Sequence, residues 1–169
     1  RLLMVAWARR CVSETDWNIS SPDPVDDAIL DQEGDLWLAF FAGKRRADQY
    51  DVNGFTGVSS STISSGISAF EILHDGRLAI ASYNKKIYVH GSDGTLSNTL
   101  SEPNGIVSSL REIDNTTLLA GTTGGTVYHY NTETWASSSL SLGHTKQTTY
   151  LANHGDMLSL IHISEPTRP

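Results

Sequence analysis

Histidines are the residues of this sequence best suited to metal binding or proton transfer, because imidazole is a common metal ligand and titrates near neutral pH. The chain has 6 of them. His74 and His154 lie in similar Asp- and Gly-containing segments, and His90 and His129 lie near the ends of short apolar segments. No two histidines are spaced as on one face of a helix, and no Cys-x-x-Cys pair accompanies them. We therefore expect no metal site.

Carboxylates and serines give no stronger signal for catalysis. Asp75, Asp114 and Asp156 lie in the corresponding first turns of successive repeats, beside Gly or Asn, where turn formation already accounts for an aspartate. No Gly-x-Ser-x-Gly segment supplies a nucleophile. The glycines between Gly121 and Gly125 lack the lysine of a phosphate-binding loop. The sequence therefore names no catalytic, cofactor-binding or metal-binding residue, and we expect no cofactor.

The composition is that of an acidic globular chain. Of 169 residues, 38% are hydrophobic and 8% aromatic, and the formal net charge is −7. Because this charge repels phosphate, no nucleic-acid partner is expected, and the basic run 44–46 is predicted to be a solvated turn. No apolar run is long enough to cross a membrane, which predicts no membrane partner for this fragment. Cys11 is the single cysteine, which favours a reducing compartment such as the cytoplasm.

An internal repeat of about 40 residues organises the sequence. Residues 71–82 align without a gap with residues 111–122, and the match continues to residue 130. An earlier copy starts at Leu30 and a later one at Leu151. Such periods, with several short strands per unit, indicate the blades of a β-propeller. The predicted fold class is all-β, a partial β-propeller with about three four-stranded antiparallel blades plus the start of a fourth.

Turn residues divide each repeat into four short strands. In the second repeat we place them near residues 67–73, 77–82, 86–90 and 95–100. The second strand is the most apolar in every copy, and a continuous apolar run predicts burial on both faces of a sheet. The residues predicted to be least accessible are Leu36, Trp37, Leu78, Ile80, Leu118 and Leu119.

The first turn of each repeat has the composition of a tight turn. Gly34, Gly76 and Asn115 are expected to supply positive φ there, while aspartate side chains cap the turn. Histidines and aspartates one repeat apart could still converge, because a propeller gathers equivalent positions around its channel.

Two propeller families share features with these repeats. The third repeat resembles a WD repeat in Leu118–Thr122, in the following Gly-Gly turn and in Gly143-His144. It departs from that family at Tyr130, where Trp-Asp is expected, and at the turns that lack the family's aspartate. The first repeat resembles the two-component-regulator type of sensor propeller in the motif Asp-x-x-Gly-x-Leu-Trp that begins at Asp31. Both resemblances imply the same architecture.

Three functions are compatible with such a fold, because a fold does not fix function. The first is a protein-binding scaffold that presents rigid loops and channel edges to a protein partner. The second is a ligand-sensing module of a membrane-linked regulator. The third is a propeller enzyme of the lactonase or lyase type, which would need a convergent cluster of acidic and histidine side chains around a divalent ion.

The end of the chain differs in character from the repeats. Residues 158–168 resemble the conceptual translation of a transposase-type sequencing adapter, which implies an environmental read whose frame ran into adapter. We therefore divide the chain into an N-terminal segment (1–24), propeller blades (25–157) and a non-native tail (158–169). Within the blades, the boundaries are predicted at 25–66, 67–105, 106–145 and a partial unit at 146–157. The remaining blades of a longer parent chain would complete the ring.

Overall fold

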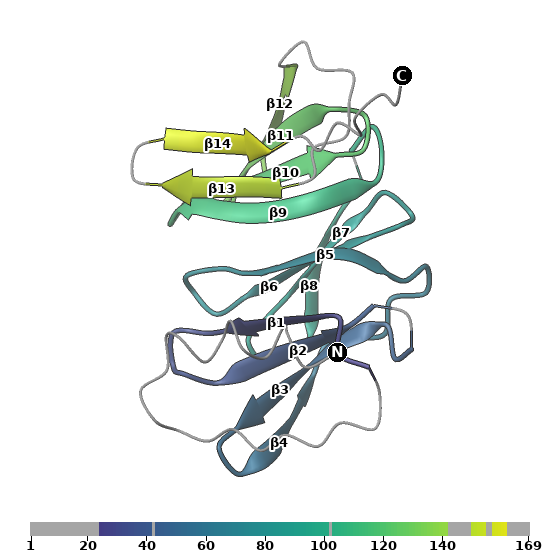
Figure 1. Cartoon of the computed structure of the whole chain (residues 1–169), viewed down its shortest axis with the longest axis vertical. Coiled ribbons are helices and arrows are strands. Elements are labelled where there is room, and N and C mark those ends of the chain that lie inside the picture. The colour runs from purple at the N-terminus through teal and green to yellow at the C-terminus, as the bar shows by residue number, and fades with distance from the viewer. Residues whose placement is uncertain (1–23, 42, 102, 142–149, 155–156, 162–169) are drawn as a thin grey trace, which may run out of the picture.

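The computed structural model describes residues 24–41, 43–101, 103–141, 150–154 and 157–161. Every regular element in this part of the chain is a β-strand (Figure 1). The strands are β1 (Asp27–Leu30), β2 (Leu36–Phe40), β3 (Arg46–Asp51), β4 (Gly54–Ser59), β5 (Ile67–Ile72), β6 (Leu78–Ser82), β7 (Ile87–His90), β8 (Leu96–Leu100), β9 (Val107–Asp114), β10 (Thr117–Thr122), β11 (Thr126–Asn131), β12 (Ser137–Ser141), β13 (Tyr150–His154) and β14 (Met157–Ile161).

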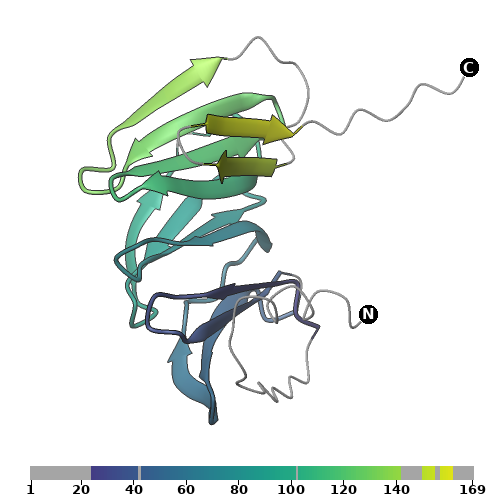
Figure 2. The same cartoon turned by 60° about the vertical axis from the view of Figure 1, so that its left-hand side comes forward.

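Consecutive strands pair antiparallel into three four-stranded sheets, β1–β4, β5–β8 and β9–β12, followed by the pair β13–β14. We call these the first, second, third and fourth sheets. They are stacked in sequence order along the long axis of the molecule (Figures 1 and 2). The leading strands form the contacts between sheets, since β5 packs against β9 and β9 against β13. This arrangement confirms the predicted all-β fold with propeller-type blades.

The second strand of each four-stranded sheet is the most deeply buried, as its composition predicts. All residues of β6 and β10 are buried, and β2 is buried except at its first residue. Leu78, Ile80 and Leu118 have no exposed surface, and Trp37 is 1% exposed. The prediction was wrong for Leu36, which is only partly buried. It begins β2 opposite Leu30 at the end of the sheet, so neighbouring sheets cover less of it.

Apolar side chains fill the gaps between sheets as two main clusters. Between the first and second sheets lie Trp37, Ala39, Ala47, Ile63, Ile67, Phe70, Leu78 and Ile80. Between the second and third sheets lie residues of β5–β11, including Ala79, Ala81, Ile87 and Val89 on the opposite face of the second sheet. The alternation of β6 between the two clusters explains why its apolar run is continuous.

A hydrogen-bonded turn connects β1 and β2 of the first sheet. Oδ1 of Asp31 accepts the backbone N–H groups of Glu33 and Asp35, at 3.1 and 2.8 Å. Oδ2 of Asp31 accepts the indole N–H of Trp37 at 3.1 Å. Gly34 has φ +91° within this turn. The Asp-x-x-Gly-x-Leu-Trp motif therefore locks the turn between β1 and β2 and orients the buried tryptophan.

The left-handed backbone positions repeat along the chain, although not all where the sequence predicts. Gly76 has φ +81° as expected, whereas Asn115 is not among the residues with positive φ. A different series, Arg45, Lys85 and Gly125, has φ of +54°, +65° and +81°. These residues are 40 apart and occupy the same turn, between the second and third strands of each sheet. The turn geometry recurs in all three sheets even though a side chain is disfavoured there.

The two ends of the chain bear on the predicted division of the sequence. The N-terminal segment 1–24 lies outside the described residues except for its last residue. Residues 158–161 of the predicted tail belong to β14 and pair with β13, as their β-compatible composition allows. No helix in the described part of the chain is long and apolar enough to span a membrane.

Candidate functional site

The three histidines with described side chains lie in separate environments. His74 follows β5 and approaches Glu112 of β9, with 3.0 Å between Nδ1 and Oε1. His90 ends β7, is fully buried and lies 2.8 Å from Oγ of Ser61 through Nε2. His129 is exposed on β11. Within the described ranges no three His, Cys, Asp or Glu residues are grouped to hold a metal.

The turn aspartates have the structural role that the sequence suggests. Asp75 accepts the backbone N–H of Arg77 at 3.1 Å, and Asp114 accepts that of Thr116 at 2.9 Å. Burial acts to raise the pKa of Asp75, but the hydrogen bonds and charge of Arg77 outweigh it and lower the pKa below its ordinary value. The hydrogen bonds from the backbone and side chain of Thr116 lower the pKa of Asp114. Asp156 lies outside the described residues.

A cluster of charged residues joins the leading strands of the second and third sheets. Oε1 of Glu71 on β5 accepts from Nη1 of Arg111 at 3.3 Å and from the backbone N–H of Glu112 at 3.4 Å. Glu112 in turn accepts the backbone N–H of His74 at 2.7 Å. Burial of Glu71, which is 8% exposed, raises its pKa to about 7, although Arg111 acts in the opposite direction. The cluster links the second and third sheets through Glu71, Arg111 and Glu112.

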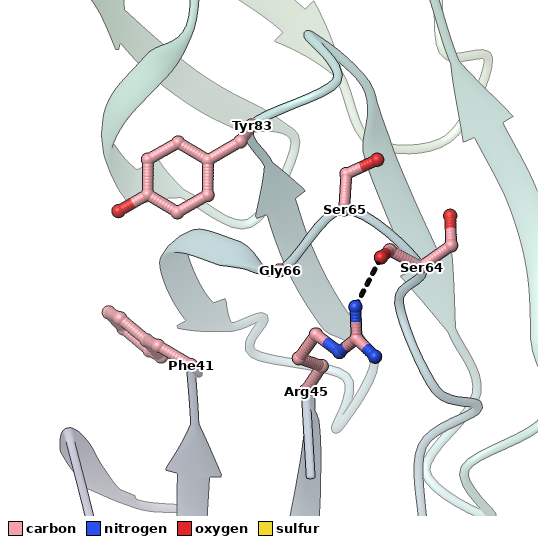
Figure 3. A pocket seen from close by; sticks show the side chains of 6 residues that line it. All are labelled: Phe41, Arg45, Ser64, Ser65, Gly66 and Tyr83. Atoms are coloured by element: carbon pink, nitrogen blue, oxygen red, sulfur yellow. Dashed lines mark hydrogen bonds between the residues drawn. The ribbon is translucent and has the colours of Figure 1, made fainter. Parts of the chain in front are cut away.

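A second candidate site is an open hollow between the first and second sheets. Its volume is about 350 Å³, at the lower end of the range of about 300–1,000 Å³ for ligand sites. Two aromatic side chains, one arginine and small residues line it (Figure 3): Phe41, Arg45, Ser64, Ser65, Gly66 and Tyr83. In Figure 3 the rings of Tyr83 and Phe41 lie on one side of Gly66, and the guanidinium of Arg45 lies on the other.

Backbone hydrogen bonds fix the aromatic walls of this hollow. The N–H of Phe41 donates to Oδ2 of Asp26 at 2.7 Å, and its carbonyl accepts the N–H of Ile67 at 3.4 Å. The N–H of Tyr83 donates to the carbonyl of Gly66 at 3.4 Å. Both aromatic residues follow directly after second strands, so the sheets and the linker 60–66 set their separation.

Arg45 is the charged group of the hollow. Nη1 of its side chain donates to the carbonyl of Ser64 at 2.6 Å, and its own carbonyl accepts the N–H of Ile63 at 2.7 Å. Its neighbours are neutralised differently, since Lys44 and Arg46 both bind the buried carboxylate of Asp48, at 3.1 and 2.7 Å. No carboxylate lines the hollow. The prediction of a solvated basic turn at 44–46 is therefore correct only for Arg45, which is exposed.

The next gap between sheets shows why the hollow forms where it does. There the N–H of Thr123 donates to the carbonyl of Ile106 at 2.8 Å, the counterpart of the Tyr83–Gly66 hydrogen bond. At the position of Gly66 this gap has the half-buried side chain of Ile106, and at the position of Arg45 it has Lys85. The linker of the first gap thus has a glycine with φ +79° where the linker of the second gap has an isoleucine.

Sequence reasoning missed the hollow, although the repeat alignment contains a signal for it. Phe41 and Tyr83 both stand directly after a second strand, and Gly66 breaks the apolar pattern that Ile106 keeps. This pattern indicates a hollow only when it is known that the linker is hydrogen-bonded to both aromatic residues, from Ile67 to Phe41 and from Tyr83 to Gly66.

Comparisons with solved structures agree with the fold. Saccharomyces cerevisiae Sqt1, a WD40 repeat protein, superposes with a TM-score of 0.65 at 17% identity, over 81% of this chain and 41% of Sqt1. The computationally designed Ika8 protein superposes with a TM-score of 0.69 at 18% identity, over 83% of this chain and 43% of that protein. The chain thus spans about two fifths of each structure. No protein family model and no curated protein matches the sequence. At these identities the likeness shows the propeller-type fold alone.

Proposed function

We propose that this chain is part of a β-propeller that acts as a protein-interaction scaffold, and that the hollow between the first and second sheets belongs to its binding surface. Four-stranded blades and rigid linkers provide the frame for such a surface. The single observation that carries the proposal is the pairing of two ordered aromatic side chains with an exposed arginine around an open hollow. Aromatic and arginine side chains are enriched where proteins bind one another.

The aromatic walls support a protein partner through their exposure and their rigidity. Tyr83 is 56% exposed although its backbone is hydrogen-bonded to the linker. Because the backbone of Tyr83 is already held, a partner that covers the ring does not have to order that part of the chain, so more of the contact energy is retained as affinity. The hollow is open rather than enclosed, which suits a side chain inserted from a larger partner.

A peptide-display selection on the immobilised 169-residue chain tests this proposal. We expect enriched peptides that lose at least tenfold in affinity on Tyr83→Ser, because this change removes one wall of the hollow. Phe55→Ser is the matched control, since Phe55 is 51% exposed on β4 and does not line the hollow. Equal binding of all selected peptides to the chain and to the Tyr83 variant would overturn the proposed surface.

A further inference from the structure

We infer that the hollow recognises an extended peptide segment in which an aliphatic residue and a carboxylate residue are two positions apart. This inference rests on the proposed function and specifies the chemistry of the partner. Its basis is the layout of the hollow, where aromatic rings lie on one side of Gly66 and an exposed guanidinium on the other (Figure 3).

Charge complementarity selects the carboxylate. The chain carries a formal net charge of −7, yet the hollow is lined by one cation and by no anion. The neighbouring cations are already engaged, because Lys44 and Arg46 bind Asp48. Among the described residues, the side chain of Arg45 makes one hydrogen bond, to the backbone carbonyl of Ser64, and has no carboxylate partner. A guanidinium presents several donors in a planar fork, which matches the two oxygens of a carboxylate.

The aromatic walls and the glycine select an aliphatic side chain in an extended segment. Phe41 and Tyr83 offer apolar ring faces, and a Cβ atom at Gly66 would lie 3.4 Å from both the Phe41 carbonyl and the Tyr83 ring. The absence of that atom lets a ligand backbone approach the linker closely. In an extended segment, side chains two positions apart point to the same side. Such a pair presents its aliphatic side chain and its carboxylate to one face, as the rings and the guanidinium lie on the two sides of Gly66.

The orientation of Arg45 is set before a ligand binds. Its left-handed backbone, with φ +54°, is held by the hydrogen bond from Ile63, and its side chain is held by the carbonyl of Ser64. The repeat also supplies a test substitution, because the equivalent residue of the third sheet is glycine with φ +81°. Arg45→Gly removes the charge and relieves the backbone at a position where glycine already occurs in this fold.

The test uses two synthetic peptides, acetyl-SLSES-amide and its glutamine counterpart acetyl-SLSQS-amide, titrated into the isotope-labelled 169-residue chain and followed by NMR. We expect both to shift the signals of Gly66 and Tyr83, and the glutamate peptide to bind about two- to fivefold more tightly, as for an exposed ion pair. Arg45→Gly removes this preference and Arg45→Lys keeps part of it. The preference also declines as salt rises from low to high concentration.

The outcomes separate this inference from the proposed function. Equal affinity of the two peptides for the unmodified chain, or a preference that survives Arg45→Gly, would refute carboxylate recognition. Display-selected peptides that depend on Tyr83 but lack an acidic residue would also refute it, while leaving the scaffold proposal intact. Selected peptides that bind the Tyr83→Ser variant as tightly as the unmodified chain would refute both the inference and the proposed surface. Thermal unfolding of each variant confirms that it folds.

Discussion

Oε1 of Glu71 on β5 lies 3.3 Å from Nη1 of Arg111 on β9, so an ion pair joins the second and third sheets. The two residues are 40 positions apart and therefore occupy equivalent places in consecutive repeats. One repeat supplies the acid and the next supplies the base. The Glu71 carboxyl is 8% exposed, and its charge is costly to bury despite the arginine.

Glu71 is expected to make the stability of the chain fall as pH rises from about 4.5 to about 7. Its pKa is raised to about 7 in the folded chain from an ordinary value of 4.5. Between these values the folded chain holds a proton that the unfolded chain has released, so the free energy of unfolding decreases with rising pH. The loss attributable to Glu71 is roughly 3 kcal/mol across this window. Glu71→Gln removes it.

Urea unfolding at pH 5 and at pH 8 measures this effect. The change in the free energy of unfolding between pH 5 and pH 8 is compared in the unmodified chain, in Glu71→Gln and in the exposed control Glu133→Gln. Subtracting the change measured in Glu71→Gln from that of the unmodified chain gives the contribution of Glu71 apart from the other titrating groups. An unchanged pH dependence in Glu71→Gln would contradict the assignment.

His90 is expected to make the chain less stable as pH falls, whereas Glu71 makes it less stable as pH rises. Burial lowers the pKa of His90 below the ordinary value of 6.5, and the backbone of Tyr88 acts in the opposite direction. Nδ1 of His90 has no hydrogen-bond partner among the described residues. Below about pH 6.5 the unfolded chain binds a proton here that the folded chain excludes, so stability is lost as pH falls. Tyrosine occupies the equivalent buried positions Tyr50 and Tyr130, which are 7% and 1% exposed. We expect His90→Tyr to fold and to lose less stability between pH 7 and pH 5 than the unmodified chain. A larger acid loss in the variant would disprove this.

Leu118 is a test of the blade core. It is fully buried in β10 and belongs to the cluster between the second and third sheets. Leu118→Ala leaves a cavity and is expected to reduce the free energy of unfolding by about 2–5 kcal/mol. Leu140→Ala is the control, because Leu140 is 53% exposed, and it is expected to change stability by less than about 1 kcal/mol. Similar losses for both variants would mean that burial does not decide stability here.

The isolated 169-residue chain is expected to associate in solution. In the described part of the chain the fourth sheet has two strands where the preceding sheets have four, and β14 (MLSLI) is its edge. An apolar edge strand is a template for pairing with another chain. Leu160→Lys should therefore reduce the oligomeric fraction in size-exclusion chromatography with light scattering. A monomer at all concentrations in the unmodified chain would refute the expectation. The outer face of the first sheet contributes less, since Leu38 and Phe40 are 4% and 0% exposed.

Residues 158–169 are expected to be absent from the native gene. This expectation comes from the resemblance of residues 158–168 to translated adapter sequence. Pairing of β14 with β13 does not bear on this origin, because an apolar β-compatible segment pairs with any available edge. Amplification of the source locus with primers independent of the adapter, followed by sequencing, gives the result. Recovery of the same codons in the locus would show that the segment is native.

The strands could be predicted from the sequence because their signals are local. In the second sheet the predicted limits agree with β5–β8 to within one residue at each end. Repeated turn residues and apolar runs define each strand, and the 40-residue period shows that the units stack alike. The same locality explains Asp31, whose contacts with Asp35 and Trp37 lie within six residues of it. It also explains the turn aspartates, each of which binds a residue two positions further on.

The two candidate sites were decided only by the packing of one sheet on the next. Glu71 and Arg111 are 40 residues apart along the chain. They meet because the leading strands of neighbouring sheets lie side by side. The hollow brings Phe41, Gly66 and Tyr83 together from a first-sheet strand end, a linker and a second-sheet strand end. Local propensity gives no information on such distances. The sequence alone therefore determined the repeated strands and their buried faces, whereas the tertiary structure decided which side chains meet between blades and which gap stays open.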